Sequence, residues 1–97
     1  MAHVDWEEIK ERRPRNSDRD AGYAAARIAY ELGEQVRNLR ESRGWSQRDL
    51  SRRTGMTQPA IARFEAGGTT PTIPVLQRLA RAFDGSLNVE IVAKVVA

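Results

Sequence analysis

Residues 47–64 read QRDLSRRTGMTQPAIARF, and this stretch decides the fold of the chain. It holds two short segments on either side of Gly55, which tolerates the positive φ that a tight turn between helices needs. Ser51 is small, so the second segment can cross close to the first. The apolar positions at which two such helices would touch are Leu50, Met56, Ile61 and Phe64. The stretch therefore predicts two short helices packed against each other at an angle.

Length and composition allow one small domain and exclude several kinds of site. The chain has 97 residues and no cysteine, so it holds neither a disulfide nor a thiolate metal site. His3 is the only histidine, and we expect it in a solvated tail. No paired acid and base, activated nucleophile or metal cluster is visible, so we expect neither an enzyme nor a bound cofactor or metal. No apolar run reaches the length of a membrane span or a signal core, which predicts a soluble, cytoplasmic protein.

Positive charge is concentrated in residues 37–63. The whole chain carries a net charge of +3, whereas this window holds seven arginines against Glu41 and Asp49, a net charge of +5. Arginine can engage a phosphate or the edge of a guanine with two donors at once. The concentration favours a nucleic-acid partner, although a solvated helical surface would have a similar composition.

The N-terminal residues predict a short amphipathic helix over 3–13. Trp6 and Ile9 lie three apart there among charged residues, so they share one helical face. Pro14 is expected to end this helix, because proline disfavours helical geometry in the residue before it. Residues 15–20 predict a polar link.

A long helix is expected over residues 20–43, closed by a left-handed Gly44. Its apolar stripe would consist of Ile28, Leu32, Val36 and Leu39, with Gly33 as a mild interruption. Three shorter helices should follow, over 47–54, from Thr57 to about Ala66 and from about Thr72 to Gly85. Ser46 with Asp49 forms a capping box for the first of them. The core-facing residues of the last are Ile73, Leu76, Leu79, Ala80 and Phe83.

The C-terminal residues change to a period of two, which indicates a strand. The alternating apolar residues are Leu87, Val89, Ile91, Ala93 and Val95. A single strand cannot pair its own backbone donors and acceptors, so we expect Leu87, Val89 and Ile91 to pair with a second copy across a two-fold axis. An apolar tail folded onto the helices is the alternative.

Residues 36–83 resemble the Xre-type helix-turn-helix domain of phage repressors and Cro proteins. The resemblance is carried by LRESRGWSQRDLSRRTGMTQPAIARFEAG and PTIPVLQRLARAFDG. It implies an all-α, lambda-repressor-like bundle whose second motif helix lies in the major groove of DNA. The expected organisation is a partner-contacting helix and linker over 1–20, a DNA-binding domain over 21–86 and a dimerisation strand over 87–97.

The Xre resemblance also implies which residues contact DNA. In that family the Gln that opens the first motif helix holds a phosphate, and here it is Gln47; a helix N-terminus by itself also attracts an anion. Gln58 can bind adenine and Arg63 guanine through two hydrogen bonds each, whereas Pro59 offers only an apolar contact. The expected set is Gln47, Arg48, Thr57, Gln58, Pro59, Ala60, Arg63, Thr69 and Thr70. Ordinary solvated surface is the alternative for each of them.

Arg40 and Glu65 match two places that this family often links. The resemblance therefore predicts a partly buried ion pair between them. We expect the pair to fix the angle of the recognition helix more than to add net stability, because desolvation offsets much of the attraction.

The surroundings of the domain resemble HigA-type antitoxins, through RDAGYAAARIAYELGEQV and the tail GSLNVEIVA. This resemblance implies a small basic RelE-like or HigB-like toxin ribonuclease as partner, and autorepression by a homodimer on double-stranded operator DNA, with the protein then at the nucleoid. Trp6, Ile9 and Tyr23 would hold the toxin, since aromatic residues are enriched in interface hot spots. Trp6 packed on the chain's own core is the alternative. A solitary Xre-family repressor and a protein-docking adaptor without DNA also stay open.

Overall fold

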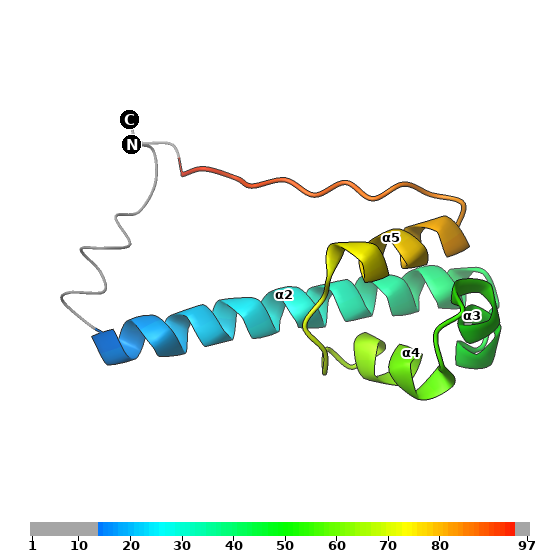
Figure 1. Ribbon diagram of the computed structural model, residues 1–97, viewed down its shortest axis with the longest axis horizontal. Coiled ribbons are helices and arrows are strands. Elements are labelled where there is room, and N and C mark those ends of the chain that lie inside the picture. Colours follow the sequence, from blue (N-terminus) through cyan, green and yellow to red (C-terminus); the bar gives the residue numbers. More distant parts are fainter. Residues whose placement is uncertain (1–13, 95–97) are drawn as a thin grey trace.

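The computed structural model describes residues 14–94, with side chains from residue 19 onward. All regular structure in this part is helical: α2 (Pro14–Ser42), α3 (Gln47–Thr54), α4 (Gln58–Glu65) and α5 (Ile73–Ala82). Figure 1 shows α2 as a long rod, with the three shorter helices gathered around its C-terminal half. The helix expected over residues 3–13, with Trp6 and Ile9, lies outside the described residues. The predicted all-helical bundle is confirmed for the part described.

The start of α2 differs from the prediction. Residues 15–20 were expected to form a polar link, but they are helical and α2 begins at Pro14. Proline is well tolerated at the first position of a helix, because the N–H that it lacks has no partner within the helix. The other end of α2 follows the prediction, with Ser42 as its last residue and Gly44 at φ 70°.

Each of the three shorter helices begins at a hydroxyl cap. The Ser46 hydroxyl accepts the Asp49 N–H while the Asp49 carboxylate accepts the Ser46 N–H, so the predicted capping box is confirmed. Thr57 and Thr72 cap α4 and α5 in the same way, each accepting the N–H of the third residue onward. Gly55 adopts φ 76°, the left-handed conformation that ends α3 and allows the turn.

The core lies where the four helices meet. Its buried apolar side chains are Val36, Leu50, Ile61, Phe64, Leu79 and Phe83. Leu50 and Ile61 are 0% and 1% exposed, and burying a side chain of this size contributes about 1.5–3 kcal/mol. Met56, the fourth predicted anchor, is half-buried against them. Ile73 and Leu39 were expected to face the core but are exposed, Ile73 in the first turn of α5 and Leu39 on the outer side of α2.

The buried stripe of α2 is rotated from the one that its larger apolar residues predicted. Ala29 and Gly33 are buried, whereas Ile28 is exposed. A Cβ on Gly33 would overlap the carbonyl oxygen of Phe64 and come within 2.7 Å of that of Glu65. Gly33 is therefore no mild interruption: it is the point at which the C-terminal end of α4 rests on α2.

The C-terminal segment is not the strand that the sequence predicted. Residues 85–94 leave the end of α5 and run back toward the level of the N-terminal half of α2 (Figure 1). A strand requires ladder hydrogen bonds, and within the described chain no backbone–backbone hydrogen bond involves residues 86–94. Leu87 is half-buried, whereas Val89 and Ile91 are exposed.

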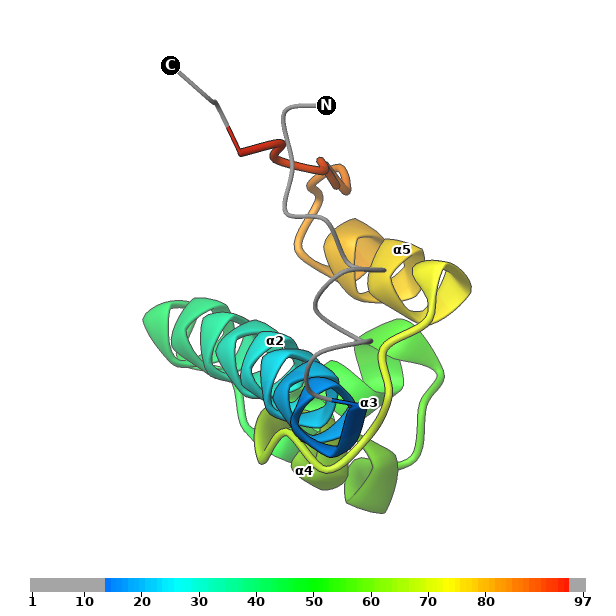
Figure 2. The same cartoon turned by 90° about the vertical axis from the view of Figure 1, so that its left-hand side faces the viewer.

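The N-terminal half of α2 extends beyond the bundle. Figures 1 and 2 show it projecting past α4 and α5. Tyr23 is 70% exposed on this part. Tyr30, farther along α2 beside Gly67, is 57% exposed. α2 is 29 residues long, yet neither it nor any other helix of residues 14–94 has a stretch apolar enough to cross a membrane.

Candidate nucleic-acid interface

α4 turns one edge toward solvent and the other toward the core. The exposed residues of its N-cap and helix are Thr57, Gln58, Pro59 and Arg63. Ala60 is half-buried, and Ile61 with Phe64 anchors the inner side. Because the inner anchors are almost fully buried, the exposed edge is held at a fixed position on the body.

Arg40 and Glu65 form an ion pair with two hydrogen bonds. Arg40 Nε donates to Glu65 Oε2 at 2.7 Å and Nη2 donates to Oε1 at 3.0 Å, while Nη1 reaches the Trp45 carbonyl oxygen at 2.8 Å. The two side chains are only 12% and 1% exposed. The hydrogen bonds with Glu65 raise the pKa of Arg40 despite the opposing effect of burial. A single guanidinium thus links α2, the end of α4 and the turn before α3.

Two glutamines extend this ion pair to the protein surface. Gln47 Nε2 donates to Glu65 Oε1 at 3.2 Å, and Gln58 Nε2 donates to Gln47 Oε1 at 2.9 Å. The Glu65 carboxylate only accepts hydrogen bonds, so Gln47 must turn its NH₂ group toward it. The Gln47 oxygen then faces Gln58, which must in turn present its own NH₂ group. The buried charge therefore sets the orientation of both amides.

Both amides keep hydrogen-bonding groups that the series from Glu65 does not use. Gln58 keeps one N–H and its carbonyl oxygen, the donor and acceptor that match the N7 and N6–H₂ edge of adenine. Gln47 keeps one side-chain N–H at the N-terminus of α3. Its backbone N–H precedes the first donor of the helical ladder, which is Leu50 N to Ser46 O. This end of α3 therefore suits an anion.

Arg37 is a residue of this site that the sequence reasoning counted only as charge. Its Nε lies 3.9 Å from Glu65 Oε1, and its side chain is half exposed. The signal was its spacing, since Arg37 and Arg40 lie three apart and share a helical face. Arg37 brings a second, more exposed guanidinium to the same carboxylate.

The arginines at the start and middle of α3 differ in their surroundings. Arg48 is exposed at the N-terminal turn. Arg52 Nη2 lies 2.6 Å from Asp49 Oδ1. Hydrogen bonds from the Ser46 backbone and hydroxyl lower the pKa of Asp49, and Arg52 adds to the effect. The charge of Arg52 is thus partly compensated by a carboxylate that stays ionised.

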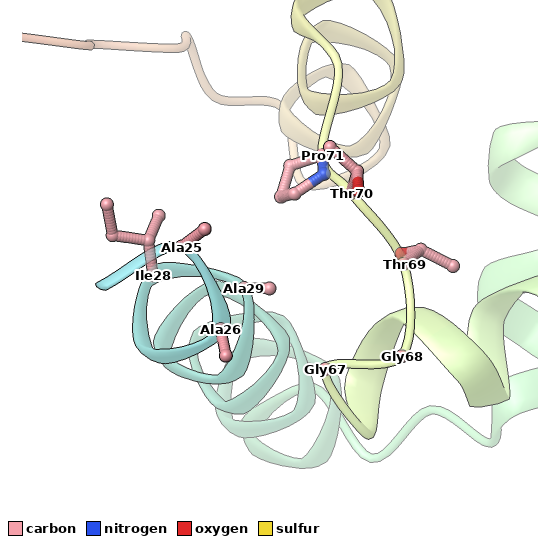
Figure 3. Close-up of a pocket in the computed structure, with 9 residues that line it drawn as sticks. All are labelled: Ala25, Ala26, Ile28, Ala29, Gly67, Gly68, Thr69, Thr70 and Pro71. Carbon is pink, nitrogen blue, oxygen red and sulfur yellow. The ribbon is translucent and has the colours of Figure 1, made fainter. Parts of the chain in front are cut away.

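Thr69 and Thr70 lie apart from the other predicted contacts. They follow α4, at the opposite end from Gln58, and line a shallow groove of about 400 Å³ against Ala25, Ala26 and Ala29 of α2. Figure 3 shows the Thr69 side chain pointing away from α2. The structure therefore brings Gln47, Gln58 and the N-terminal edge of α4 together, and leaves the threonine pair at a second place.

An aromatic stack supports the turn before α3. The Trp45 and Phe83 rings lie 5.3 Å apart at an interplanar angle of 12°. The Arg53 guanidinium lies 3.9 Å from the centre of the Trp45 ring, and Arg43 Nη2 donates to the Phe83 carbonyl oxygen at 3.0 Å. The stack joins the ends of α2 and α5 to α3, so it stabilises the frame on which Gln47 is placed.

The residues that the structure describes hold no group of three or more His, Cys, Asp or Glu that could bind a metal ion. The arrangement is instead one of amide and guanidinium donors around two helix N-termini. Such groups recognise phosphates and base edges.

Three relatives share the helical body. An uncharacterised HTH-type transcriptional regulator, y4dL, of Sinorhizobium fredii (strain NBRC 101917 / NGR234) is 43% identical over 53 residues, which are 55% of this chain and 27% of that protein. An HTH_3 family transcriptional regulator from Vibrio cholerae superposes with a TM-score of 0.61 at 29% identity, over 64% of this chain and 35% of that one. The restriction-modification controller protein C.AhdI from Aeromonas hydrophila gives 0.59 at 25% identity, over 61% and 89%.

The relatives support the helix-turn-helix resemblance seen in the sequence but not the antitoxin resemblance. The chain spans only about a quarter of the length of the Sinorhizobium relative and about a third of the Vibrio chain. None of the three names refers to an antitoxin, so they lend no support to the HigA resemblance. Residues 36–89, more than half of the chain, match the HTH_3 helix-turn-helix family. The chain therefore belongs to the HTH_3 helix-turn-helix family.

Proposed function

We propose that the protein is a sequence-specific DNA-binding transcription regulator that reads the major groove with α4. The observation that carries the proposal is the hydrogen-bonded series from Glu65 through Gln47 to Gln58, which orients a base-reading amide before any DNA is bound. Preorganisation of this kind lowers the entropy cost of binding. The names of the relatives, two transcriptional regulators and one controller protein, support the same class.

The proposed roles follow from the donors and acceptors that remain open. Gln58 reads adenine and Arg63 reads guanine, while Pro59 and Ala60 make apolar contacts such as one with a thymine methyl group. Gln47 and Arg48 hold phosphates at the N-terminus of α3, and Thr57 adds a hydroxyl beside them. Thr69 and Thr70 would touch a phosphate farther along the duplex.

A single α4 of eight residues reaches few base pairs, so we propose that the protein binds its operator as a homodimer. Two recognition helices then enter successive major grooves about 34 Å apart on a palindromic site. Occupation of that site would block transcription of the neighbouring genes, including its own. The protein would act where the DNA is, in the cytoplasm at the nucleoid.

The test begins with enrichment of bound sequences from a random DNA pool, followed by affinity measurements on the consensus. Gln58→Ala should weaken binding by about 5- to 150-fold, which corresponds to the 1–3 kcal/mol of a two-bond base contact. The matched control is Gln77→Ala, which removes an exposed glutamine from α5 and should leave affinity unchanged. Arg48→Ala should weaken all sequences alike and reduce the salt slope by about one.

A pool that yields no consensus would reject sequence-specific reading. Equal losses for Gln58→Ala and Gln77→Ala would reject the role of α4, even if a consensus emerged. Binding without salt dependence would reject the phosphate contacts, because each contact releases a counterion.

The antitoxin function is a second candidate, favoured by the exposed Tyr23 on the projecting half of α2. Tyr23, with Trp6 and Ile9, would hold a small basic toxin. The test is capture of partners by the tagged protein from its own host. The function is supported if a captured basic protein arrests growth when it is expressed alone. Co-expression of the natural chain should relieve the arrest, whereas co-expression of the Tyr23→Ala variant should not. Recovery of the protein by itself leaves the solitary repressor.

A further inference from the structure

We propose that one face of α2 binds the phosphates that border the major groove in which α4 lies. This α2 phosphate face consists of the exposed residues Arg19, Tyr23, Tyr30 and Arg37. The inference rests on the proposed function, because α4 must first enter the groove. It deepens that function by giving the projecting half of α2 a partner of defined chemistry, the sugar–phosphate backbone of the same duplex.

The contacts with α4 identify the side of α2 on which these residues lie. The four positions are separated by four, seven and seven residues, and such spacings keep side chains on one side of a helix. Gly33 lies on the same side, where the carbonyl groups at the end of α4 rest on α2, and Arg37 Nε lies 3.9 Å from Glu65 Oε1. A Cβ on Gly67, just after α4, would lie 2.9 Å from the Tyr30 Cα. The α2 phosphate face therefore passes the end of α4 and continues along the projecting half of α2 (Figure 1).

The depth of the major groove places this side of α2 at the level of the phosphates. The groove is about 8.5 Å deep, and the axes of two packed helices lie about 8–10 Å apart. A recognition helix that reaches the base edges therefore leaves the helix packed behind it about level with the backbones that wall the groove. α2 is that helix, because the end of α4 packs on it at Gly33. Long side chains on the α4 side of α2 can then reach a phosphate.

The exposed groups of the α2 phosphate face suit this partner. Tyr23 and Tyr30 are 70% and 57% exposed, and the side chain of Arg37 is 49% exposed. Arginine and tyrosine both donate hydrogen bonds to phosphate oxygens in protein–DNA interfaces. The four residues carry two positive charges and no carboxylate, whereas Glu31 and Glu34 line a separate surface of α2. The face is therefore complementary in charge to a nucleic-acid backbone.

Arg37 joins this face to the network behind α4. The Glu65 carboxylate carries one negative charge and already accepts two hydrogen bonds from Arg40. Arg37 lies beyond hydrogen-bonding distance of the same carboxylate, at 3.9 Å. Two guanidinium groups and one carboxylate leave a net charge of +1 beside Gln47, whose Nε2 donates to Glu65 Oε1. A phosphate held by Gln47 and Arg37 together would balance this charge.

Protein docking is the competing use of the tyrosines, since the antitoxin candidate assigns Tyr23 to a toxin. The two uses depend on different parts of the side chain. A phosphate contact needs the phenolic O–H as donor, whereas a protein interface gains mainly from burial of the ring. Replacement of tyrosine by phenylalanine removes the first and keeps the second, so it separates the two partners.

Salt dependence tests the charged residues on a duplex of mixed sequence, which requires no consensus. Arg19→Ala and Arg37→Ala should each reduce the slope of log affinity against log salt by about one, because each removes a phosphate contact. Arg37→Lys should keep most of the natural slope, since the charge remains. The matched control is Arg81→Ala, which removes an exposed arginine from α5, across α2 from α4 in Figure 1, and should leave the slope unchanged.

Backbone neutralisation locates the tyrosine contacts on the consensus enriched from the random pool. Each phosphate is replaced in turn by an uncharged methylphosphonate, and the affinity is measured again. At a phosphate bound by Tyr23, the replacement should weaken the natural chain by about 3- to 10-fold and the Tyr23→Phe variant hardly at all. Tyr30→Phe should behave in the same way at a second phosphate. Arg48→Ala should lose its sensitivity at a different position.

Two outcomes would overturn the inference. One is a salt slope that Arg19→Ala and Arg37→Ala leave unchanged, and the other is a methylphosphonate pattern that is the same in both phenylalanine variants as in the natural chain. If DNA binding also ignores Tyr23→Ala while capture of a protein partner is lost, the face belongs to protein docking.

Failure of the proposed function looks different from failure of the inference. A chain that enriches no consensus, but whose salt slope falls with Arg19→Ala, would keep the α2 phosphate face and reject the sequence-specific regulator. A chain that reads a consensus through Gln58 with unchanged slopes would do the reverse. A chain that binds no duplex at low salt would reject both.

Discussion

The two halves of α2 follow different physical rules although they belong to one continuous helix. In the C-terminal half, Gly33 lies directly under the backbone of α4, and Val36 and Arg40 lie in or beside the core. In the N-terminal half, Gly22 has no atom within 4 Å of a Cβ placed on it, and Tyr23 is exposed. The helix-turn-helix body therefore needs only the C-terminal half of this helix. The projecting half is available for other contacts.

The largest expected effect is the loss of a buried isoleucine, measured against two exposed ones. Ile61→Ala should lower the free energy of unfolding by about 2–5 kcal/mol, because it opens a cavity in the core. Ile28→Ala at the middle of α2 and Ile91→Ala in the tail should change it by about 0.5 kcal/mol or less, since both residues are exposed. Urea denaturation followed by circular dichroism measures all three. A large loss for Ile28→Ala would show that this side chain is packed in solution.

Glu65→Ala should have the next largest effect. It leaves the nearly buried Arg40 guanidinium without its carboxylate, and breaking a buried pair costs about 3 kcal/mol. The exposed pair of Arg52 and Asp49 provides the control, because Arg52→Ala should cost only about 0.2–1 kcal/mol. If both variants lost the same small amount of stability, the network behind α4 would be no stronger than a surface ion pair.

The two glycines of α2 lie in different surroundings, Gly33 against α4 and Gly22 in open space. Gly33→Ala should destabilise by about 1–3 kcal/mol, because its methyl group would meet backbone oxygens that cannot move independently. Gly22→Ala should instead stabilise by about 0.5–1 kcal/mol, since alanine favours the helix and the site is open. Thermal unfolding gives the sign in each case. Two shifts in the same direction would contradict the division of α2.

The smallest expected effect is the pH dependence of the α3 cap. The pKa of Asp49 is lowered in the folded chain, first by hydrogen bonds from Ser46. Its contribution to stability is therefore present above the unfolded pKa of 3.8 and is lost as the pH falls through the folded pKa. Asp49→Asn should reduce stability near neutral pH but differ less from the natural chain at about pH 3. A difference that stays constant with pH would exclude an ionised cap.

Much of the helical body could be predicted because its signals are local. Each of these signals depends on residues three or fewer positions apart, so it can be recognised in the sequence. They are the Ser46 and Asp49 capping box, the Thr57 cap and the left-handed Gly55. The start of α2 was missed for the opposite reason. Proline both ends a preceding helix and opens a following one, and residues 14–20 carry no local signal that decides between these uses.

The three short helices, their caps and turns, and the basic surface around them could be predicted from the sequence, because these depend on neighbouring residues and on composition. The buried face of α2 could not, because it depends on the carbonyl groups of α4, which leave no room for a side chain at Gly33. The packing of the helices also sets how Glu65 orients Gln47 and Gln58, because hydrogen bonds between residues 11 and 18 positions apart exist only after the helices have packed. The alternation in the tail was visible in the sequence, but a strand forms only where a second backbone lies beside the first.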